Sequence, residues 1–178
     1  MNVAAASRHY VVLQESNEMK NVLFLCTGNS ARSILAESLM NHWGGGRLRG
    51  FSAGSFPKAE PHPMALDLLR SLQLPVEGLR SKSWDEFAAP GAPAMDFIFT
   101  VCDAAAGEVC PIWPGKPITA HWGLPDPAAV EGDEMTRRAA FREAFRLLEN
   151  RIKIFASLRF DDLDRNALTA ETKRIGRE

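Results

Sequence analysis

A short, continuously apolar run at residues 22–26 is the feature that most constrains the fold of this chain. After Asn21 the run reads Val-Leu-Phe-Leu-Cys, and it stops at the polar segment Thr27-Gly28-Asn29. Such a run is typical of a parallel strand that is buried on both faces. From Ser33 onward the apolar residues recur at helical spacing, and Gly44-Gly45-Gly46 ends that pattern. The folded part of the chain therefore opens with a strand, a loop and a helix.

Further apolar segments along the chain alternate between strand and helix patterns. Strands are predicted at residues 48–54, 96–101 and 117–122. Helices are predicted from Pro63 to before Pro75, through the apolar repeat from Phe141 to Phe155, near residues 168–175, and as one turn at 84–87. Alternating strands and helices indicate βαβ units. We therefore predict a single three-layer α/β domain with a four-stranded parallel sheet flanked by helices, Rossmann-like in the broad sense.

Composition limits the classes of function. The 178 residues carry 21 Lys and Arg against 22 Asp and Glu, so the chain has no bulk attraction to nucleic acid or anionic lipid. No apolar stretch approaches the ~18 residues that span a bilayer, and residues 1–18 lack the apolar core of a secretory signal. We expect a cytoplasmic monomer with no nucleic-acid or membrane partner. Residues 1–18 are predicted to form a flexible extension, and residues 19–178 the folded domain.

The segment from Cys26 to Ser33 lies between the first strand and the first helix and has the composition of an anion-binding loop. If the segment curls, its backbone N–H groups and the positive end of the helix face one point. The guanidinium of Arg32 would then bind two oxygens of a tetrahedral oxyanion. The same field predicts a lowered pKa for the Cys26 thiol, to which Ser33 could donate its hydroxyl. A cysteine at the end of a strand can otherwise be simply a small buried residue.

The predicted oxyanion-binding loop has one strained position. Asn29 is expected at a positive φ, which asparagine tolerates better than most residues. No cysteine or histidine in the chain has typical metal-ligand spacing. The oxyanion would be bound by Thr27, Gly28, Asn29, Ser30, Ala31, Arg32 and Ser33.

Residues 22–33, Val-Leu-Phe-Leu-Cys-Thr-Gly-Asn-Ser-Ala-Arg-Ser, resemble the phosphate-binding loop of the low-molecular-weight tyrosine phosphatase superfamily. Within it, the chain is most similar to the arsenate reductases of the thioredoxin-coupled class. The resemblance covers roughly residues 20–158, including the segment 102–110 and His121-Trp-Gly-Leu-Pro-Asp-Pro127. The loop motif specifies the superfamily, and the two later cysteines, Cys102 and Cys110, select the reductase. The resemblance implies a low-molecular-weight phosphatase-like fold.

The resemblance also implies an activity, the reduction of arsenate to arsenite in arsenic detoxification. Cys26 would attack arsenic, and Asp126 would be the general acid in a loop that closes over the anion. Cys102 would then attack the Cys26 sulfur, and Cys110 would attack Cys102, leaving a disulfide. Thioredoxin, or glutaredoxin with glutathione, would supply the electrons. No organic cofactor is required, and phosphate or sulfate would serve as analogues of arsenate.

Each of these residues has a plainer interpretation. Asp126 lies between two prolines and fits a turn, Cys102 fits a core position, and Cys110 fits a loop. His121 is more often structural than catalytic in such a place. The alternative function is a phosphatase that hydrolyses a phosphocysteine with water. A third interpretation is an oxyanion-binding regulatory module without turnover.

Family members can also bind a potassium ion beside the loop. Asn29, Glu37 and Ser52 match three of its side-chain ligands, whereas the remaining carboxylate position falls on Trp84, with Asp85 adjacent. The sequence therefore predicts part of a potassium site and no other metal.

The spacing of the two later cysteines predicts a conformational change. Seven residues, 103–109, separate Cys102 from Cys110, where the well-known reductases of the class have six. An intact helix of eight residues rises ~12 Å, whereas the Cα atoms of a disulfide lie ~4.4–6.8 Å apart. The segment 103–109 must therefore be non-helical, or loop out, when the two thiols are oxidised.

Overall fold

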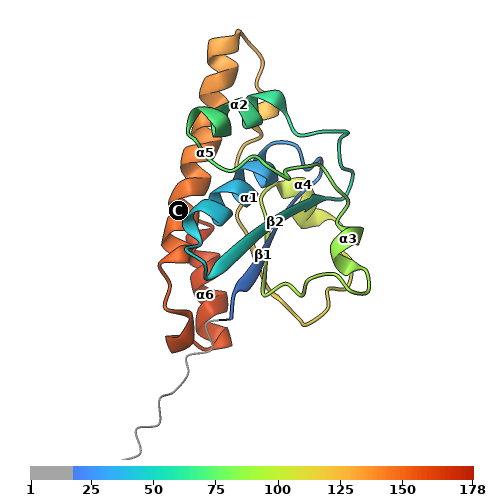
Figure 1. Ribbon diagram of the computed structural model, residues 1–178, viewed down its shortest axis with the longest axis vertical. Coiled ribbons are helices and arrows are strands. Elements are labelled where there is room, and N and C mark those ends of the chain that lie inside the picture. The colour runs from blue at the N-terminus through green and yellow to red at the C-terminus, as the bar shows by residue number, and fades with distance from the viewer. Residues whose placement is uncertain (1–17) are drawn as a thin grey trace, which may run out of the picture.

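A computed structural model describes residues 18–178 of the chain (Figure 1). The extension predicted at residues 1–18 therefore lies outside the described residues, apart from Glu18. Within residues 18–178, none of the helices is both long enough and apolar enough to cross a membrane.

The four predicted strands form one parallel sheet. They are β1 (Lys20–Cys26), β2 (Leu48–Gly54), β3 (Phe97–Thr100) and β4 (Ile118–His121). Their order in the sheet is β2-β1-β3-β4, and β1 pairs with β2 on one side and β3 on the other. The chain thus changes direction across the sheet at β1. In open parallel sheets, ligands bind at such a point, beyond the carboxyl ends of the strands, and β1 ends there at Cys26.

Three of the helices begin after a residue whose side chain accepts from one of their first N–H groups. The ring of His62 accepts from the Met64 amide at 3.1 Å, Asp133 accepts from Thr136, and Asp164 accepts from Ala167. The helices are α1 (Arg32–Trp43), α2 (Pro63–Ser71), α3 (Asp85–Ala88), α4 (Asp103–Gly107), α5 (Glu134–Ala156) and α6 (Arg165–Ile175), with 3₁₀ turns η1 (Pro127–Ala129) and η2 (Phe160–Asp162). The helix α4 and both 3₁₀ turns were not predicted from the sequence.

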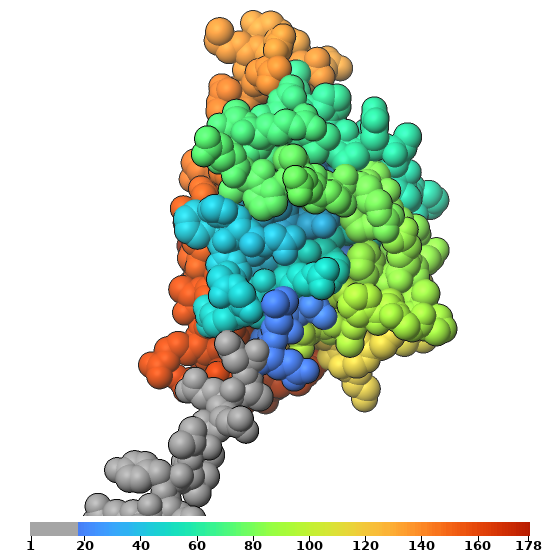
Figure 2. All heavy atoms as spheres, viewed as in Figure 1, coloured from blue at the N-terminus to red at the C-terminus, as the bar shows by residue number. Residues whose placement is uncertain are grey.

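The two faces of the sheet are covered differently. Val22, Phe24 and Phe99 belong to one core cluster with residues of α1, α2, α5 and α6. Leu23 and Leu25 point to the opposite face, where α3 and loop side chains cover them. Figure 1 shows α5 and α6 on one side of the sheet and α3 on the other, and Figure 2 shows residues near 90 as a yellow-green surface on the α3 side. The predicted helix-flanked sheet is confirmed.

The side chain of Trp122, just after β4, fixes the start of the loop that leads to Asp126. Its ring is fully buried and stacks on Phe99, with the ring centroids 4.1 Å apart. Its indole N–H donates to the carbonyl of Thr172 at 2.8 Å, and its own carbonyl accepts from the buried guanidinium of Arg151 at 2.8 Å. The loop after β4 is therefore anchored to both α5 and α6.

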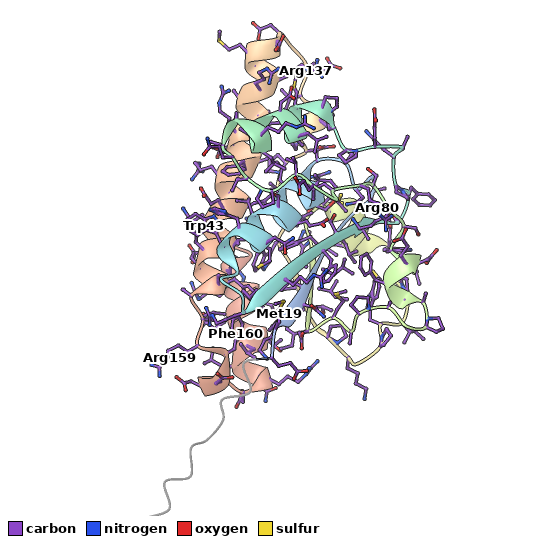
Figure 3. All side chains as sticks on the ribbon, in the orientation of Figure 1. Met19, Trp43, Arg80, Arg137, Arg159 and Phe160 are labelled. Atoms are coloured by element: carbon purple, nitrogen blue, oxygen red, sulfur yellow. The ribbon has the colours of Figure 1, made fainter. Side chains whose placement is uncertain are left out.

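Substitution of Trp122→Ala is expected to lower the free energy of unfolding by about 3–5 kcal/mol, because it removes a large buried ring and one buried hydrogen bond. Urea denaturation followed by circular dichroism measures this. The matched control is Trp43→Ala. Trp43 is partly exposed at the end of α1 (Figure 3), so its loss should cost less than a third as much. Equal losses for the two variants would contradict the anchoring role.

Candidate active site

The backbone carbonyls of the loop after β1 are turned outward by hydrogen bonds from other parts of the chain. Four successive carbonyls accept: Thr27 from the Phe56 amide at 3.0 Å, Gly28 from the Lys58 amide at 2.9 Å, Asn29 from the Ser81 hydroxyl at 2.6 Å, and Ser30 from the His62 amide at 2.8 Å. Asn29 has φ 42°, as the sequence predicted. Because its carbonyls face outward, the loop can present its amides to a common centre, as in other anion-binding nests.

The sulfur of Cys26 lies at that centre. Its Sγ is 2.9 Å from the Ser33 hydroxyl oxygen, and the backbone amides of Ser33 and Asn29 also act to lower the pKa of its thiol. These donors stabilise a thiolate, since hydrogen bonds to the charged form favour it. The predicted contact between Cys26 and Ser33 is confirmed.

The predicted lowering of the Cys26 pKa is wrong. Burial raises the pKa of the Cys26 thiol, and the neighbouring Cys102 raises it further. The Ser33 hydroxyl and the two loop amides lower the pKa but do not outweigh burial. The sequence indicated the donors around the sulfur, but not how completely the folded chain removes it from water.

Arg32 and Asp126 line the same cavity as Cys26, which has a volume of about 240 Å³. One guanidinium nitrogen of Arg32 donates to the Leu124 carbonyl at 3.0 Å, and another lies 3.4 Å from a carboxylate oxygen of Asp126. The second carboxylate oxygen accepts from the Ala128 amide at 3.1 Å. Asp126 is therefore both a turn residue and a charged group facing the anion loop, so its two interpretations describe one geometry.

Cys102 lies beside the anion loop, at the amino end of α4. Its buried Sγ accepts from the Ala105 amide at 3.3 Å and lies 3.7 Å from the Thr27 hydroxyl. The same hydroxyl donates to Glu108 at 3.3 Å. The core interpretation of Cys102 is thus correct about burial, and the contact with Thr27 places its sulfur next to the loop that holds Cys26.

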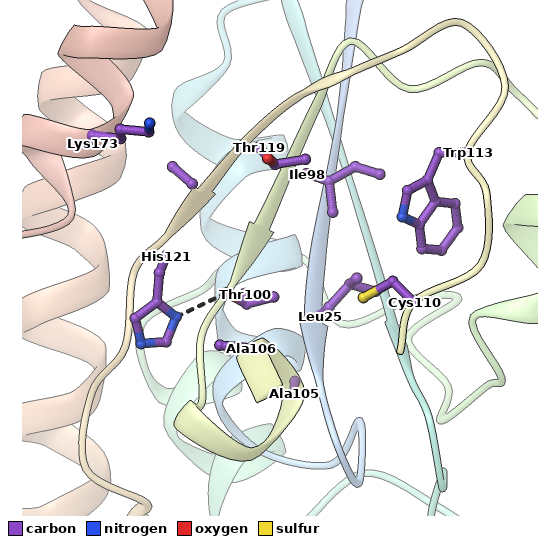
Figure 4. Close-up of a pocket in the computed structure, with 11 residues that line it drawn as sticks. Leu25, Ile98, Thr100, Ala105, Ala106, Cys110, Trp113, Thr119, His121 and Lys173 are labelled. Atoms are coloured by element: carbon purple, nitrogen blue, oxygen red, sulfur yellow. Dashed lines mark hydrogen bonds between the residues drawn. The ribbon is translucent and has the colours of Figure 1, made fainter. Parts of the chain in front are cut away.

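Cys110 lies apart from this group, in a second cavity of about 450 Å³. Figure 4 shows its sulfur near Leu25, with Trp113 close by. Burial raises the pKa of the Cys110 thiol, and the charge of Glu108 raises it further. All three cysteines are free, and α4 separates Cys110 from Cys102 along the chain.

His121 holds α4 against the sheet. Its Nδ1 lies 2.8 Å from the Thr100 hydroxyl (Figure 4), and its Nε2 lies 2.9 Å from a carboxylate oxygen of Asp103, the first residue of α4. Both contacts of His121 therefore help to position α4 relative to the sheet.

The three residues predicted to bind potassium do come together, but an ammonium group lies among them. Nζ of Lys82 is 3.4 Å from a carboxylate oxygen of Glu37 and 3.4 Å from the Ser52 hydroxyl, which in turn accepts from Asn29 at 2.9 Å. A potassium ion would have to displace this ammonium, so the residues present do not fit the ion. Sequence reasoning missed Lys82, although it lies two residues before Trp84.

Across residues 18–178, no group of three or more His, Cys, Asp or Glu side chains is arranged to hold a metal ion.

Comparisons with known proteins agree with this geometry. The family model for low molecular weight phosphotyrosine protein phosphatase matches residues 21–170. An arsenate reductase of Halalkalibacterium halodurans is 34% identical over 140 residues, which cover 77% of this chain and 95% of the relative. An arsenate reductase of Bacillus subtilis is 33% identical over 142 residues, covering 78% of this chain and 96% of the relative.

Solved structures show the same fold. An arsenate reductase from Archaeoglobus fulgidus aligns with a TM-score of 0.61 at 25% identity, covering 77% of this chain and 99% of that chain. A thioredoxin-dependent arsenate reductase from Corynebacterium glutamicum aligns with a TM-score of 0.56 at 26% identity. The alignment covers 78% of this chain but 61% of the Corynebacterium chain, so the two differ in extent.

Removal of the hydroxyl donor to Cys26 by Ser33→Ala is expected to raise the pKa of that thiol and to slow its alkylation at pH 7 at least tenfold, since a hydrogen bond to a charged group contributes ~1.5–3 kcal/mol. Below its pKa the thiolate fraction grows tenfold per pH unit, so the variant's rate profile moves to higher pH. The measurement is the rate of iodoacetamide alkylation of Cys26 between pH 6 and 9, in a Cys102→Ser, Cys110→Ser background.

Ser30→Ala is the matched control, because Ser30 is a buried serine of the same loop without a hydrogen bond to the sulfur. Its alkylation profile should coincide with that of the parent. If Ser33→Ala alkylates along the parent's profile too, the hydroxyl does not stabilise the thiolate.

Proposed function

This chain belongs to the low-molecular-weight phosphotyrosine protein phosphatase family, and we propose that it reduces arsenate to arsenite. The observation that carries the proposal is the second thiol beside the anion loop. Cys102 is buried next to Thr27, one residue from Cys26. A phosphatase needs one nucleophilic thiol, whereas a reductase needs a second thiol to take electrons from the first. The relatives named as arsenate reductases support the same assignment.

The first proposed step joins sulfur to arsenic. Arsenate would bind between the loop amides and the Arg32 guanidinium, which would exchange its contact with Asp126 for the anion. The Cys26 thiolate then attacks arsenic, and an S–As bond forms while one As–O bond breaks. Asp126, at the rim of the cavity, would supply the proton with which the oxygen leaves as water.

The second proposed step transfers two electrons to arsenic. The Cys102 thiolate attacks the Cys26 sulfur, so that an S–S bond forms and the S–As bond breaks. The electron pair of the broken bond stays on arsenic, which leaves as arsenite. The Ala105 amide donates to the attacking sulfur and holds it next to the Thr27 hydroxyl, beside the loop that carries Cys26.

The third proposed step restores Cys26. The Cys110 thiolate attacks the Cys102 sulfur and releases the Cys26 thiolate, leaving a Cys102–Cys110 disulfide. A dithiol protein of the thioredoxin type, or less favourably glutaredoxin with glutathione, would reduce it. Val109 and Ile112 flank Cys110 and are 95% and 96% exposed, which gives such a partner an apolar surface near the disulfide.

The proposed setting is the cytoplasm, where thioredoxin is available and thiols stay reduced. The proposed unit is a monomer that uses no organic cofactor, because one chain supplies the anion loop, the acid and all three thiols.

A phosphatase is the second candidate, because both reactions begin with the same attack by Cys26. Phe56 lines the anion cavity and is 75% exposed, so an aryl phosphate could pack its ring there. Water would then hydrolyse the phosphocysteine. We propose this as a residual activity, since it leaves Cys102 and Cys110 unused.

Substitution of Cys102→Ser or Cys110→Ser, made separately, distinguishes the two activities. Arsenate turnover with thioredoxin, thioredoxin reductase and NADPH is expected to fall at least a hundredfold in each variant. Hydrolysis of para-nitrophenyl phosphate should stay within threefold of the parent, since that reaction needs neither thiol. Cys26→Ser is the reference that abolishes both. Parallel changes in the two activities would favour a phosphatase, and arsenate binding without turnover in the parent would favour a sensor.

Oxidation of the Cys102–Cys110 pair is expected to unwind α4. Hydrogen exchange of the peptide covering residues 102–110 should quicken at least fivefold after one equivalent of arsenate in the absence of thioredoxin. Cys102 lies beside the anion loop and Cys110 lies in a separate cavity, so the chain between them must rearrange before their sulfurs can bond. The short helix α3 (Asp85–Ala88) is the internal control and should exchange at an unchanged rate. Equal exchange of residues 102–110 in both states, with the disulfide verified by mass spectrometry, would contradict the switch.

A further inference from the structure

Lys82 carries a positive charge into the protein interior, close to the anion loop. Its side chain is 6% exposed, and the side chain of its partner Glu37 is 13% exposed. The ammonium contacts the Glu37 carboxylate, the Ser52 hydroxyl and, at 3.0 Å, the Arg80 carbonyl. Burying two charges costs desolvation free energy that a pair at the surface does not lose. Stability alone therefore does not explain why this ion pair is buried.

The ion pair connects to Cys26 through three polar side chains. The Ser52 hydroxyl donates to Glu37, because an ionised carboxylate only accepts. The Ser52 oxygen therefore accepts from the Asn29 amide group at 2.9 Å, and the same amide group donates to the Ser33 oxygen at 2.8 Å. With its oxygen engaged in this way, Ser33 keeps its own O–H for the Cys26 sulfur.

The backbone of Lys82 orients the same asparagine. Its N–H donates to Oδ1 of Asn29 at 2.9 Å, which leaves the nitrogen of that side chain facing Ser52 and Ser33. Its carbonyl accepts from Gly54 at 2.9 Å and so ties the segment to the end of β2. Both the main chain and the side chain of Lys82 thus act on the network behind the nucleophile.

We propose that Lys82 is a positioning residue for Cys26: its ammonium holds the Glu37 carboxylate as the fixed acceptor of a hydrogen-bond chain through Ser52, Asn29 and Ser33 to the sulfur. It is a cation built into the chain, in the place where a bound monovalent ion would otherwise contact the same oxygens. The inference rests on the proposed function only in taking Cys26 as the nucleophile.

Loss of the ammonium has two chemical outcomes, and both weaken the chain. If Glu37 stays ionised, an uncompensated negative charge lies behind the thiolate and disfavours it. If Glu37 takes up a proton, its new O–H can donate to the Ser52 oxygen and compete there with the Asn29 amide group. In either case the pKa of Cys26 rises.

The test is the pH profile of Cys26 alkylation by iodoacetamide in the Cys102→Ser, Cys110→Ser background, in choline chloride of constant ionic strength. Lys82→Met keeps the length of the side chain and is expected to slow alkylation at pH 7 about tenfold and move the profile to higher pH. Arg80→Met removes a charge two residues away, where the guanidinium pairs with Glu86 at the surface, and should change nothing. A Lys82→Met profile within twofold of the parent would overturn the proposal.

The double variant Glu37→Gln, Lys82→Met separates this role from a merely structural one. Glutamine offers Ser52 a neutral acceptor and leaves no buried charge. The difference in the logarithm of the alkylation rate between the parent and Lys82→Met should therefore shrink by at least half in the double variant. It also serves if Lys82→Met does not fold. A double variant that folds but alkylates as slowly as Lys82→Met would contradict the role of the ion pair.

Replacing choline with potassium tests the idea of a built-in cation without any new variant. The Cys102→Ser, Cys110→Ser parent should be alkylated at the same rate in the two salts, whereas the rate of the Lys82→Met variant should rise at least threefold in potassium. An alkylation rate of the parent that rises severalfold with potassium would overturn the proposal. Alkylation measures the thiol itself, so these results stand even if arsenate turnover is not found.

Discussion

The outward hydrogen bonds of four successive loop carbonyls are the constraint on which this site depends. The donors come from the segment after β2 and from Ser81, so two distant segments fix the loop after β1. A loop anchored only at its ends could turn its carbonyls inward and repel an anion. The position of Cys26 at the point where the sheet changes direction explains why both segments reach it.

Burial and hydrogen bonding act on the Cys26 sulfur in opposite directions. Burial excludes water from the attacking atom and raises its pKa, while the Ser33 hydroxyl and two amides lower it. The balance depends on donors that cannot rotate away. The buried network behind the loop serves this end, because each of its side chains is engaged on both sides, from Glu37 through Ser52 and Asn29 to Ser33.

Local patterns sufficed to predict the strands, the long helices, and the loop that holds Cys26 and Arg32, whereas the place of Asp126 in the same cavity was expected from the family resemblance. These features depend on residues close in sequence, or on the rule that parallel strands end at one edge. Lys82 could not be predicted in this way, because its contact with Asn29 joins residues 53 positions apart. The direction of the Cys26 pKa was missed for a related reason: burial depends on the whole fold and not on the loop alone.

The short helix α4 accounts for the order of the proposed thiol steps. While it is intact, its Ala105 amide donates to Cys102, and its first residue is held by His121, so the second thiol is stabilised beside the loop. The same helix keeps Cys110 in a separate cavity, where burial raises its pKa. In the proposed order of steps, Cys110 therefore reaches Cys102 only after α4 has rearranged. Once Cys102 is bonded to Cys26, its sulfur no longer requires the Ala105 amide as a donor. The helix α4 then loses one of the few contacts that oppose its unwinding.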